Sequence, residues 1–371
     1  MVVAPHGPPS WAISSVVERF LHTEEVAGSS PASPTSLPPA APCRRKQVTG
    51  NWKQVPASLR RAPSSFQFLV SNFAARYTGP MPVPEPQSRQ LTGLVKLLEL
   101  DRLDQDLFVG SPGRGEGRLF GGLVAAQCVI AAHRTVEEGA LHSLHAYFLR
   151  PGSHEVPIRY VVYRIRDGRT FTTRNVVAYQ AGEAIFNLSC SFTKPEEGPS
   201  HQGPMPDAPD PERLPEWDFV RPDREERERF MRWRRERPIY IRLCDKEGTV
   251  LVNGVPTRRT WIKPKGVLPE DPAIHAAVLT YATDMGLLST ARQFTGAPNP
   301  GATASLDHAI WFHHPPRFAD WLLYTSHSPI ANAARALILG QMHRPDGTQV
   351  LSVAQEGLVR APKPPPPTAL S

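Results

Sequence analysis

The sequence predicts an α+β fold built from two copies of one unit, in which a long helix precedes an antiparallel sheet. An apolar helical pattern followed by a series of strand patterns occurs twice along the 371 residues. Short turns containing glycine separate the strand patterns. The hydrophobic fraction of 40% is enough for a substantial core, which excludes a fully disordered chain.

The first helical pattern begins at Gly121-Gly122 and continues with apolar or small residues at three- and four-residue spacing to Ala131. Strand patterns rich in β-branched and aromatic residues follow at 143–149, 156–164, 171–179 and 184–192. We expect hairpin turns at 166–168 and 180–182, because each ends in a glycine that accepts positive φ.

The second helical pattern begins at Asp271-Pro272, and we expect it to run without a break to Leu288. Strand patterns follow at 304–312, 321–327, 333–343 and 350–359. The strand that begins at Ser143 is similar in sequence to the one that begins at Ser305. This repeated order indicates a duplicated unit.

The predicted organisation has five segments. They are a proline-rich basic arm at 1–88, a first unit at 89–195, a linker with a charged helix at 196–237, a second unit at 238–361 and a proline-rich tail at 362–371. We expect the arm to be disordered. Part of it, 14–31, resembles the peptide translated from the strand opposite a transfer-RNA gene, so Met81 is a candidate for the true start.

Composition excludes several classes of protein. Eight basic and three acidic residues give the first 80 residues a charge of +5, so the remaining 291 carry only +2 of the total +7. We therefore expect no nucleic-acid partner. No run of about 18 apolar residues is present, so we expect no membrane span. The four cysteines form no C-x-x-C pair, which argues against a zinc knuckle or a secreted disulfide scaffold.

Three polar residues of the second unit interrupt apolar patterns. Asp284 lies on the apolar stripe of the helix, Ser305 begins the next strand, and Gln355 stands within the last strand. Each could be an ordinary structural group, and a serine in a strand usually is. If all three meet in one cavity, however, an acid, a hydroxyl and an amide can hold and polarise a water molecule. Such a site needs no metal, cofactor or covalent intermediate.

Other chemistries have little support. The sequence contains no Gly-x-Ser-x-Gly motif and no Walker loop. The glycines at 113, 115 and 117 follow no clear strand, so they do not form a dinucleotide fingerprint. The histidine pairs at 142 and 145 and at 313 and 314 lack the arrangement of metal ligands.

Motifs in both units resemble the acyl-CoA thioesterase II family of double hot-dog enzymes. In chain order they are RLFGG at 118–122, FLRPG at 148–152, RIRDGR at 164–169, TD at 283–284, SLDHAIWFH at 305–313 and QEGLVR at 355–360. The resemblance covers about residues 90–360. It implies a tandem hot-dog fold, with a long helix wrapped by a curved sheet in each unit, and the hydrolysis of fatty acyl-CoA to a fatty acid and coenzyme A. That activity would belong to fatty acid metabolism.

The resemblance also implies that Asp284, Ser305 and Gln355 form a catalytic trio that holds the attacking water. The first unit carries no equivalent set, since Cys190 stands where Gln355 does and its helix offers only Gln127. The remaining alternative is a non-catalytic acyl-CoA-binding or interaction module with the same fold. We expect self-association, because a hot-dog sheet has edges that need cover. The chain ends without Ser-Lys-Leu, and we expect a cytoplasmic bacterial protein.

Overall fold

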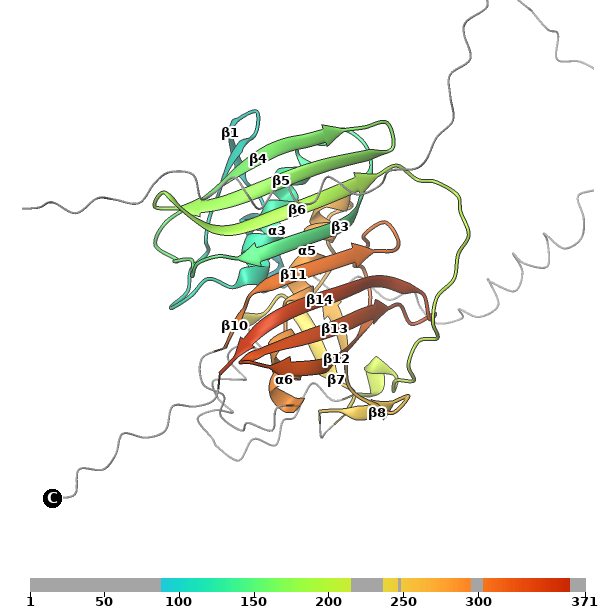
Figure 1. The fold of residues 1–371 in the computed structure, drawn as a ribbon. Coiled ribbons are helices and arrows are strands. Elements are labelled where there is room, and N and C mark those ends of the chain that lie inside the picture. Colours follow the sequence, from blue (N-terminus) through green and yellow to red (C-terminus); the bar gives the residue numbers. More distant parts are fainter. Residues whose placement is uncertain (1–87, 215–235, 246–247, 295–302, 361–371) are drawn as a thin grey trace, which may run out of the picture. The chain divides into compact units, whose positions relative to one another are not determined.

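The computed structural model describes residues 88–214, 236–245, 248–294 and 303–360 (Figure 1). The predicted arm except Ser88, most of the predicted charged helix, and the tail lie outside the described residues. The segment boundaries given above therefore stay predictions.

The first unit contains two helices and six strands. They are α2 (Arg89–Leu97), β1 (Asp101–Asp104), β2 (Leu107–Gly110), α3 (Gly121–His133), β3 (Ala140–Phe148), β4 (Ile158–Asp167), β5 (Phe171–Gln180) and β6 (Glu183–Thr193). The short 3₁₀ helix η3 (Pro211–Arg213) follows in the linker. The sequence patterns predicted α3 and β3–β6 but missed α2, β1 and β2.

The second unit repeats this plan. Its elements are β7 (Ile239–Leu243), β8 (Val250–Val252), β9 (Val255–Pro264), α5 (Pro272–Thr283), α6 (Leu287–Phe294), β10 (Thr303–Ser305), β11 (Asp307–Phe312), β12 (Leu322–Asn332), β13 (Arg335–His343) and β14 (Gln349–Val359). Strands β7–β9 precede the helix and were not predicted.

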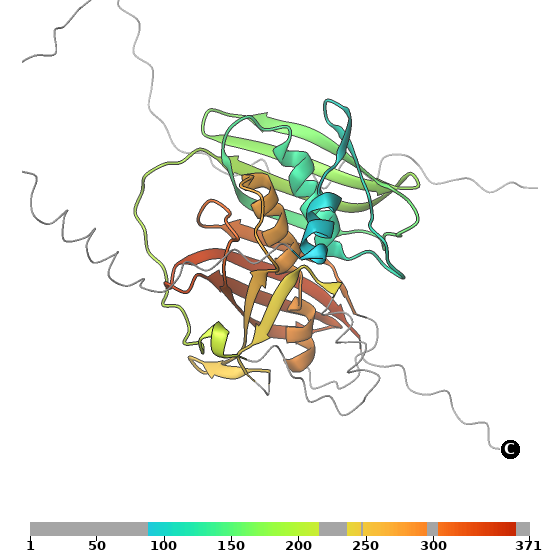
Figure 2. The same ribbon diagram turned by 180° about the vertical axis from the view of Figure 1, so that it is seen from behind.

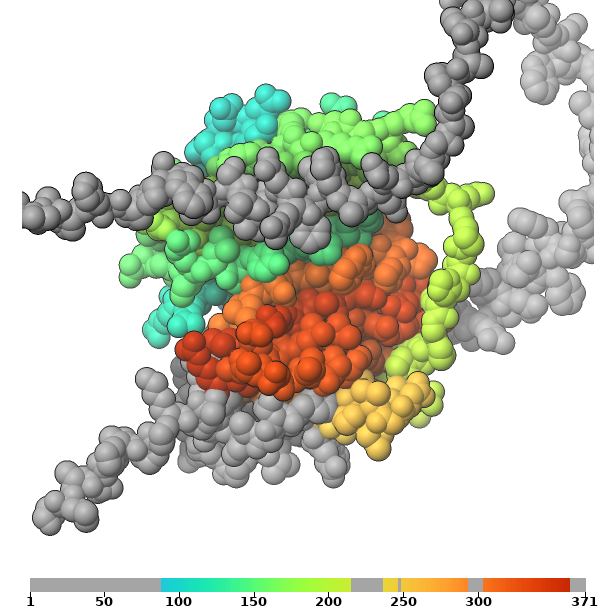
Figure 3. Space-filling model, in the orientation of Figure 1, coloured from blue at the N-terminus to red at the C-terminus, as the bar shows by residue number. Residues whose placement is uncertain are grey.

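The strands of both units form one continuous antiparallel sheet (Figure 1). Its main path runs β1-β2-β4-β5-β6-β3-β11-β14-β13-β12-β9-β7, while β10 pairs with β14 and β8 with β9. The two units join where β3 pairs with β11, with His145 opposite Ala309. Figure 3 shows the outer face of the sheet around this junction.

Helices α3 and α5 lie side by side on the inner face of the sheet (Figure 2). All residues of α3 from Gly122 to Ala132 are buried, as are all residues of α5 from Ala273 to Thr283. A helix that is apolar on every side is typical of a core position. The predicted tandem hot-dog α+β fold is therefore confirmed.

The second helix does not run to Leu288 as predicted. It ends at Thr283, and a separate helix begins at Leu287. Gly286 between them has φ 91°, a left-handed conformation that interrupts a right-handed helix. The prediction of a single strand at 304–312 is also wrong, since Leu306 separates β10 from β11.

The break in the second helix changes the position of Asp284 within the fold. Asp284 is the residue that caps the C-terminus of α5, rather than a residue in the middle of an apolar helical stripe. Within the described ranges, no helix has the length and apolar character needed to cross a membrane.

The approach of α3 to α5 requires a glycine at position 122. A Cβ added there would lie 2.9 Å from the carbonyl oxygen of Tyr281 and 2.5 Å from the Phe120 ring. We expect Gly122→Ala to lower the free energy of unfolding by about 1–3 kcal/mol, because the backbone of α5 would have to move. Urea denaturation measures the change. Gly93→Ala is the matched control, since its Cβ meets no atom within 4 Å in helix α2. It should be neutral or stabilising, and an equal loss in both variants would contradict this account.

Candidate active site

The structure brings Ser305 and Gln355 into direct contact. Strand β10 pairs with β14 so that Ser305 lies opposite Gly357, two residues from Gln355. The Nε2 amide of Gln355 donates a hydrogen bond of 2.6 Å to Ser305 Oγ. The Gln355 side chain is 1% exposed, so this polar group lies inside the core of the second unit.

Asp284 joins the same cluster from the end of α5. Its Oδ2 accepts a 2.8 Å hydrogen bond from the backbone N–H of Gly122, in the first turn of α3. Burial raises the pKa of Asp284 from 3.8 to about 7, against the opposing effects of the Gly122 N–H, the charge of Arg237 and a hydrogen bond from Gln355. Gln355 therefore links the acid to Ser305. The sequence patterns gave no indication that the first unit would supply a partner for Asp284.

Two further residues extend this network, and the sequence reasoning missed both. The imidazole of His308 lies between Gln355 and Thr283, with Nδ1 2.8 Å from Gln355 Oε1 and Nε2 2.8 Å from Thr283 Oγ1. His308 is 1% exposed and Thr283 is fully buried. Burial lowers the pKa of His308 to about 4, so the ring is neutral at neutral pH. The alternation of strand 307–312, which points His308 inward, was the signal that could have identified it.

The N-terminus of α3 adds an electrostatic element to the site. The first N–H groups of a helix have no acceptor within the helix, and the helix dipole places partial positive charge there. Gly121 and Gly122 occupy these positions, and Gly122 already donates to Asp284. This end of α3 therefore favours negative charge beside the acid.

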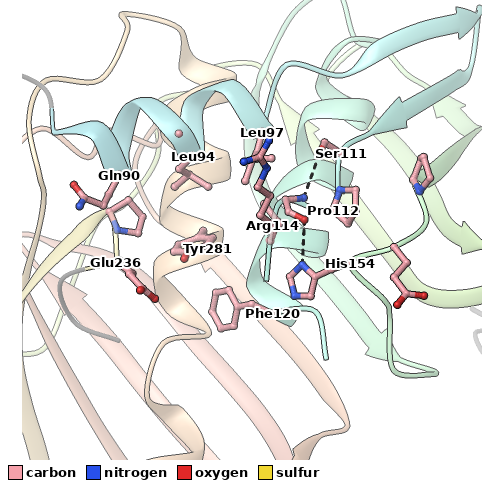
Figure 4. A pocket seen from close by; sticks show the side chains of 16 residues that line it. Gln90, Leu94, Leu97, Ser111, Pro112, Arg114, Phe120, His154, Glu236 and Tyr281 are labelled. Atoms are coloured by element: carbon pink, nitrogen blue, oxygen red, sulfur yellow. Dashed lines mark hydrogen bonds between the residues drawn. The ribbon is translucent and has the colours of Figure 1, made fainter. Parts of the chain in front are cut away.

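A cavity of about 630 Å³ lies next to this cluster, between α2, α3 and α5 (Figure 4). Both apolar and polar side chains line it. The lining residues are Gln90, Gly93, Leu94, Leu97, Ser111, Pro112, Gly113, Arg114, Phe120, Leu123, His154, Glu155, Pro157, Glu236, Pro238 and Tyr281. The volume lies within the range of about 300–1,000 Å³ that is typical of small-molecule sites.

Phe120 and Tyr281 connect the cavity to the polar cluster. Their rings meet edge to face with centroids 4.9 Å apart, and Figure 4 shows both at the cavity wall. Phe120 directly precedes Gly121, and Tyr281 precedes Asp284 by three residues. The guanidinium of Arg237 lies 4.5 Å from the Phe120 ring centroid and donates to the Tyr281 hydroxyl at 3.1 Å.

Among the residues that the structure describes, no three His, Cys, Asp or Glu side chains lie together as a set that could hold a metal ion. A carboxyl group, a hydroxyl and an amide that meet beside a helix N-terminus can position water and accept its proton. The tandem sheet and its paired inner helices define a protein of the double hot-dog class.

Comparison with known families leads to the same class. The family model described as acyl-CoA thioesterase matches residues 233–358, and that described as acyl-CoA thioesterase N-terminal domain matches residues 111–193. The chain belongs to the acyl-CoA thioesterase II family, and it is a thioester hydrolase.

Individual relatives cover most of the chain. The acyl-coenzyme A thioesterase 8 of Rattus norvegicus is 36% identical over 72% of this chain and 89% of its own length. The acyl-CoA thioesterase 2 of Haemophilus influenzae is 34% identical over 73% of this chain and 98% of its own. Among solved structures, acyl-CoA thioesterase II TesB2 from Mycobacterium marinum has a TM-score of 0.62 at 35% identity. It covers 73% of this chain and 99% of its own.

The raised pKa of Asp284 predicts a pH-dependent penalty on stability. An unfolded aspartate releases its proton near pH 3.8, whereas the folded chain keeps it to about pH 7. The folded state therefore binds more protons across this window, and its stability falls as pH rises through it. We expect Asp284→Asn, which keeps an acceptor for Gly122, to melt about 4 °C or more above the parent chain at pH 8. At pH 5, where only the lower part of this window has been crossed, the difference should be clearly smaller. Calorimetry at both pH values measures this, and a constant difference would contradict the raised pKa.

Proposed function

We propose that the chain hydrolyses fatty acyl-CoA thioesters to a free fatty acid and coenzyme A, through direct attack by a water held by Asp284, Ser305 and Gln355. The main observation in support is that the Gln355 amide, itself buried, binds Ser305 directly and also bonds to an acid whose pKa is raised to about 7. The names of the relatives support the choice of acyl-CoA as substrate.

In this mechanism Asp284 acts as the general base. The water oxygen forms a bond to the thioester carbonyl carbon while one water proton passes to the Asp284 carboxylate. The carbonyl oxygen becomes negatively charged and faces the N–H groups at the start of α3, with Gly121 as the donor that we assign. The carbon–sulfur bond then breaks. Asp284 returns the proton to the sulfur, although a thiol with a pKa of about 8.5 leaves with little assistance.

Ser305 and Gln355 fix the position of the water. Ser305 Oγ lies within the polar cluster and can accept the second water hydrogen, so that a lone pair of the water is directed at the carbonyl carbon. Gln355 holds Ser305 Oγ at 2.6 Å. Such positioning groups typically contribute through orientation rather than charge.

The role of Asp284 as the base predicts how the rate of hydrolysis depends on pH. We expect the rate of thiol release from palmitoyl-CoA to rise with pH to a plateau, with a midpoint near the Asp284 pKa of about 7. At pH 8 and above, where Asp284 of the parent chain is ionised, Asp284→Asn should lower kcat by about 10²-fold or more, because the base is lost. A thiol-reactive dye measures the release of coenzyme A. Undiminished turnover in this variant would refute the role of Asp284, and a parent chain that binds acyl-CoA without releasing thiol would indicate a non-catalytic module.

We further propose that the cavity beside Phe120 and Tyr281 receives the acyl chain. The leucines in its lining suit a hydrocarbon chain, and Phe120 and Tyr281 in its wall lie close in sequence to Gly121 and Asp284. The first unit would thus supply most of the binding surface, and the second unit the chemical groups.

Gly93 offers a direct test of this cavity. It lines the cavity from α2, and a Cβ there meets no atom within 4 Å, so a larger side chain can enter the space. We expect Gly93→Leu to raise KM for palmitoyl-CoA by about 10-fold and to leave short-chain acyl-CoA nearly unaffected. Steady-state kinetics over chains of different length measure this. Gly93→Ala is the matched control, and it should leave KM unchanged for both long-chain and short-chain acyl-CoA. The same KM change for all chain lengths would contradict the assignment.

Self-association and a cytoplasmic location stay predictions. The outer face at the β3–β11 junction supports the first, because Tyr147 and Trp311 are 60% and 38% exposed there. A second copy of the chain could bury these two aromatic side chains.

A further inference from the structure

Gln355 belongs to a largely buried series of side-chain hydrogen bonds, in which each group must act as a donor or as an acceptor. Four side chains make three contacts in it, which link Thr283 to His308, His308 to Gln355, and Gln355 to Ser305. His308 stands in the middle and is not within the water-binding cluster itself. Its effect on the site must therefore act through Gln355.

The chemistry of the amide fixes which nitrogen of His308 carries the proton. Gln355 Nε2 donates to Ser305 Oγ, and the amide also lowers the pKa of Asp284, which requires that its N–H side face the carboxylate. The remaining atom, Oε1, can only accept, and it lies 2.8 Å from His308 Nδ1. Nδ1 therefore donates. A neutral imidazole has a single N–H, so Nε2 must accept, and its partner is the Thr283 hydroxyl at 2.8 Å.

The opposite tautomer would disturb the site. With the proton on Nε2, Nδ1 and Oε1 would be two acceptors in contact. The amide would then turn over to bring its N–H groups to Nδ1. Its oxygen would face Ser305 and the Asp284 carboxylate, which would replace an attractive bond to the acid with a repulsive contact.

We propose that His308 is a positioning residue that, as the Nδ1–H tautomer, holds the Gln355 amide with its N–H groups toward Ser305 and Asp284. This inference rests on the proposed roles of the trio. The Thr283 hydroxyl faces Nε2 from the other side of the ring and can donate to it. It also lies 2.8 Å from the Thr280 carbonyl oxygen, so its hydrogen has two acceptors within reach.

The burial of His308 supports this role. Because its pKa falls to about 4, the ring stays neutral over the working range, and the orientation of Gln355 does not change with pH. The other groups that face Asp284 are the Gly122 N–H from α3, Arg237 before β7, and Tyr324 from β12. Arg258 from β9 lies nearby, where it donates to the carbonyl of Gly286. A substitution at His308 leaves all of these in place, so a change in the Asp284 pKa would report on Gln355.

Two substitutions separate hydrogen bonding from packing. His308→Leu removes the donor and keeps similar bulk. His308→Asn keeps a donor, because its amide nitrogen lies as many bonds from Cβ as Nδ1 does. We expect His308→Leu to lower kcat by about 10-fold or more and to move the midpoint of the pH–rate profile upward. His308→Asn should restore most of the rate and return the midpoint toward the parent value.

A double-mutant cycle tests whether His308 acts through Gln355. In a Gln355→Leu background, the further change His308→Leu should have no additional effect on kcat. A purely structural role would lower the melting temperature and reduce kcat by the same factor in both backgrounds. Independent effects, or an unchanged pH midpoint in His308→Leu, would overturn the inference.

The outcomes distinguish this inference from the proposed function. Full activity in Asp284→Asn would refute the trio. Loss of activity in Asp284→Asn with a normal pH midpoint in His308→Leu would refute only the role of His308. If His308→Leu does not fold, the ¹⁵N chemical shifts of His308 in the parent chain report which ring nitrogen carries the proton. A protonated Nδ1 is the expected result, and a protonated Nε2 would overturn the inference.

Discussion

The hydrogen bond from the Gly122 N–H to Asp284 is the contact on which the site depends. It joins residues that are 162 positions apart and belong to different units. It forms because α3 begins where α5 ends, at a spacing that leaves no room for a side chain on Gly122. The positive end of one helix thereby meets a carboxylate at the C-terminus of another. An acid at a helix C-terminus is otherwise unfavourable, and this neighbour offsets the cost.

The duplicated units have diverged in the use of their buried polar residues. In the first unit, Gln127 of α3 donates to the carbonyl oxygens of Leu97 and Ser111 at 2.6 and 3.0 Å, which fixes the segments around the cavity. Cys190 pairs across the strands with Arg174, and burial raises the pKa of its thiol to about 12. Such a thiol is an unreactive packing group at neutral pH. In the second unit, by contrast, the polar groups of Ser305 and Gln355 bond to each other, and Gln355 also acts on Asp284.

Local patterns predicted the duplication and most of the strands, because side-chain alternation and hydrophobic spacing repeat over several residues. They also identified Asp284, Ser305 and Gln355 as polar residues in apolar surroundings, and the structure brings these three together. The end of the second helix was missed, since Met285 and Leu288 continue the apolar spacing while the left-handed φ of Gly286 leaves no trace in that spacing. His308 was missed for a related reason. Its role depends on partners from an adjacent strand and a distant helix, and spacing along the chain gives no information about either.

The state of Asp284 reflects a balance between desolvation and compensation. Burial alone would keep the carboxyl protonated, so it could not act as a base. If neighbouring groups stabilised the carboxylate enough to cancel the effect of burial, its pKa would lie near the ordinary value and it would be a weaker proton acceptor. The Gly122 N–H, Arg237 and Gln355 each favour the ionised form, yet the pKa still lies near 7. A base at that value accepts a proton from water and returns it to a thiolate of similar basicity. In the proposed mechanism, the thioester leaving group therefore makes few further demands on the protein.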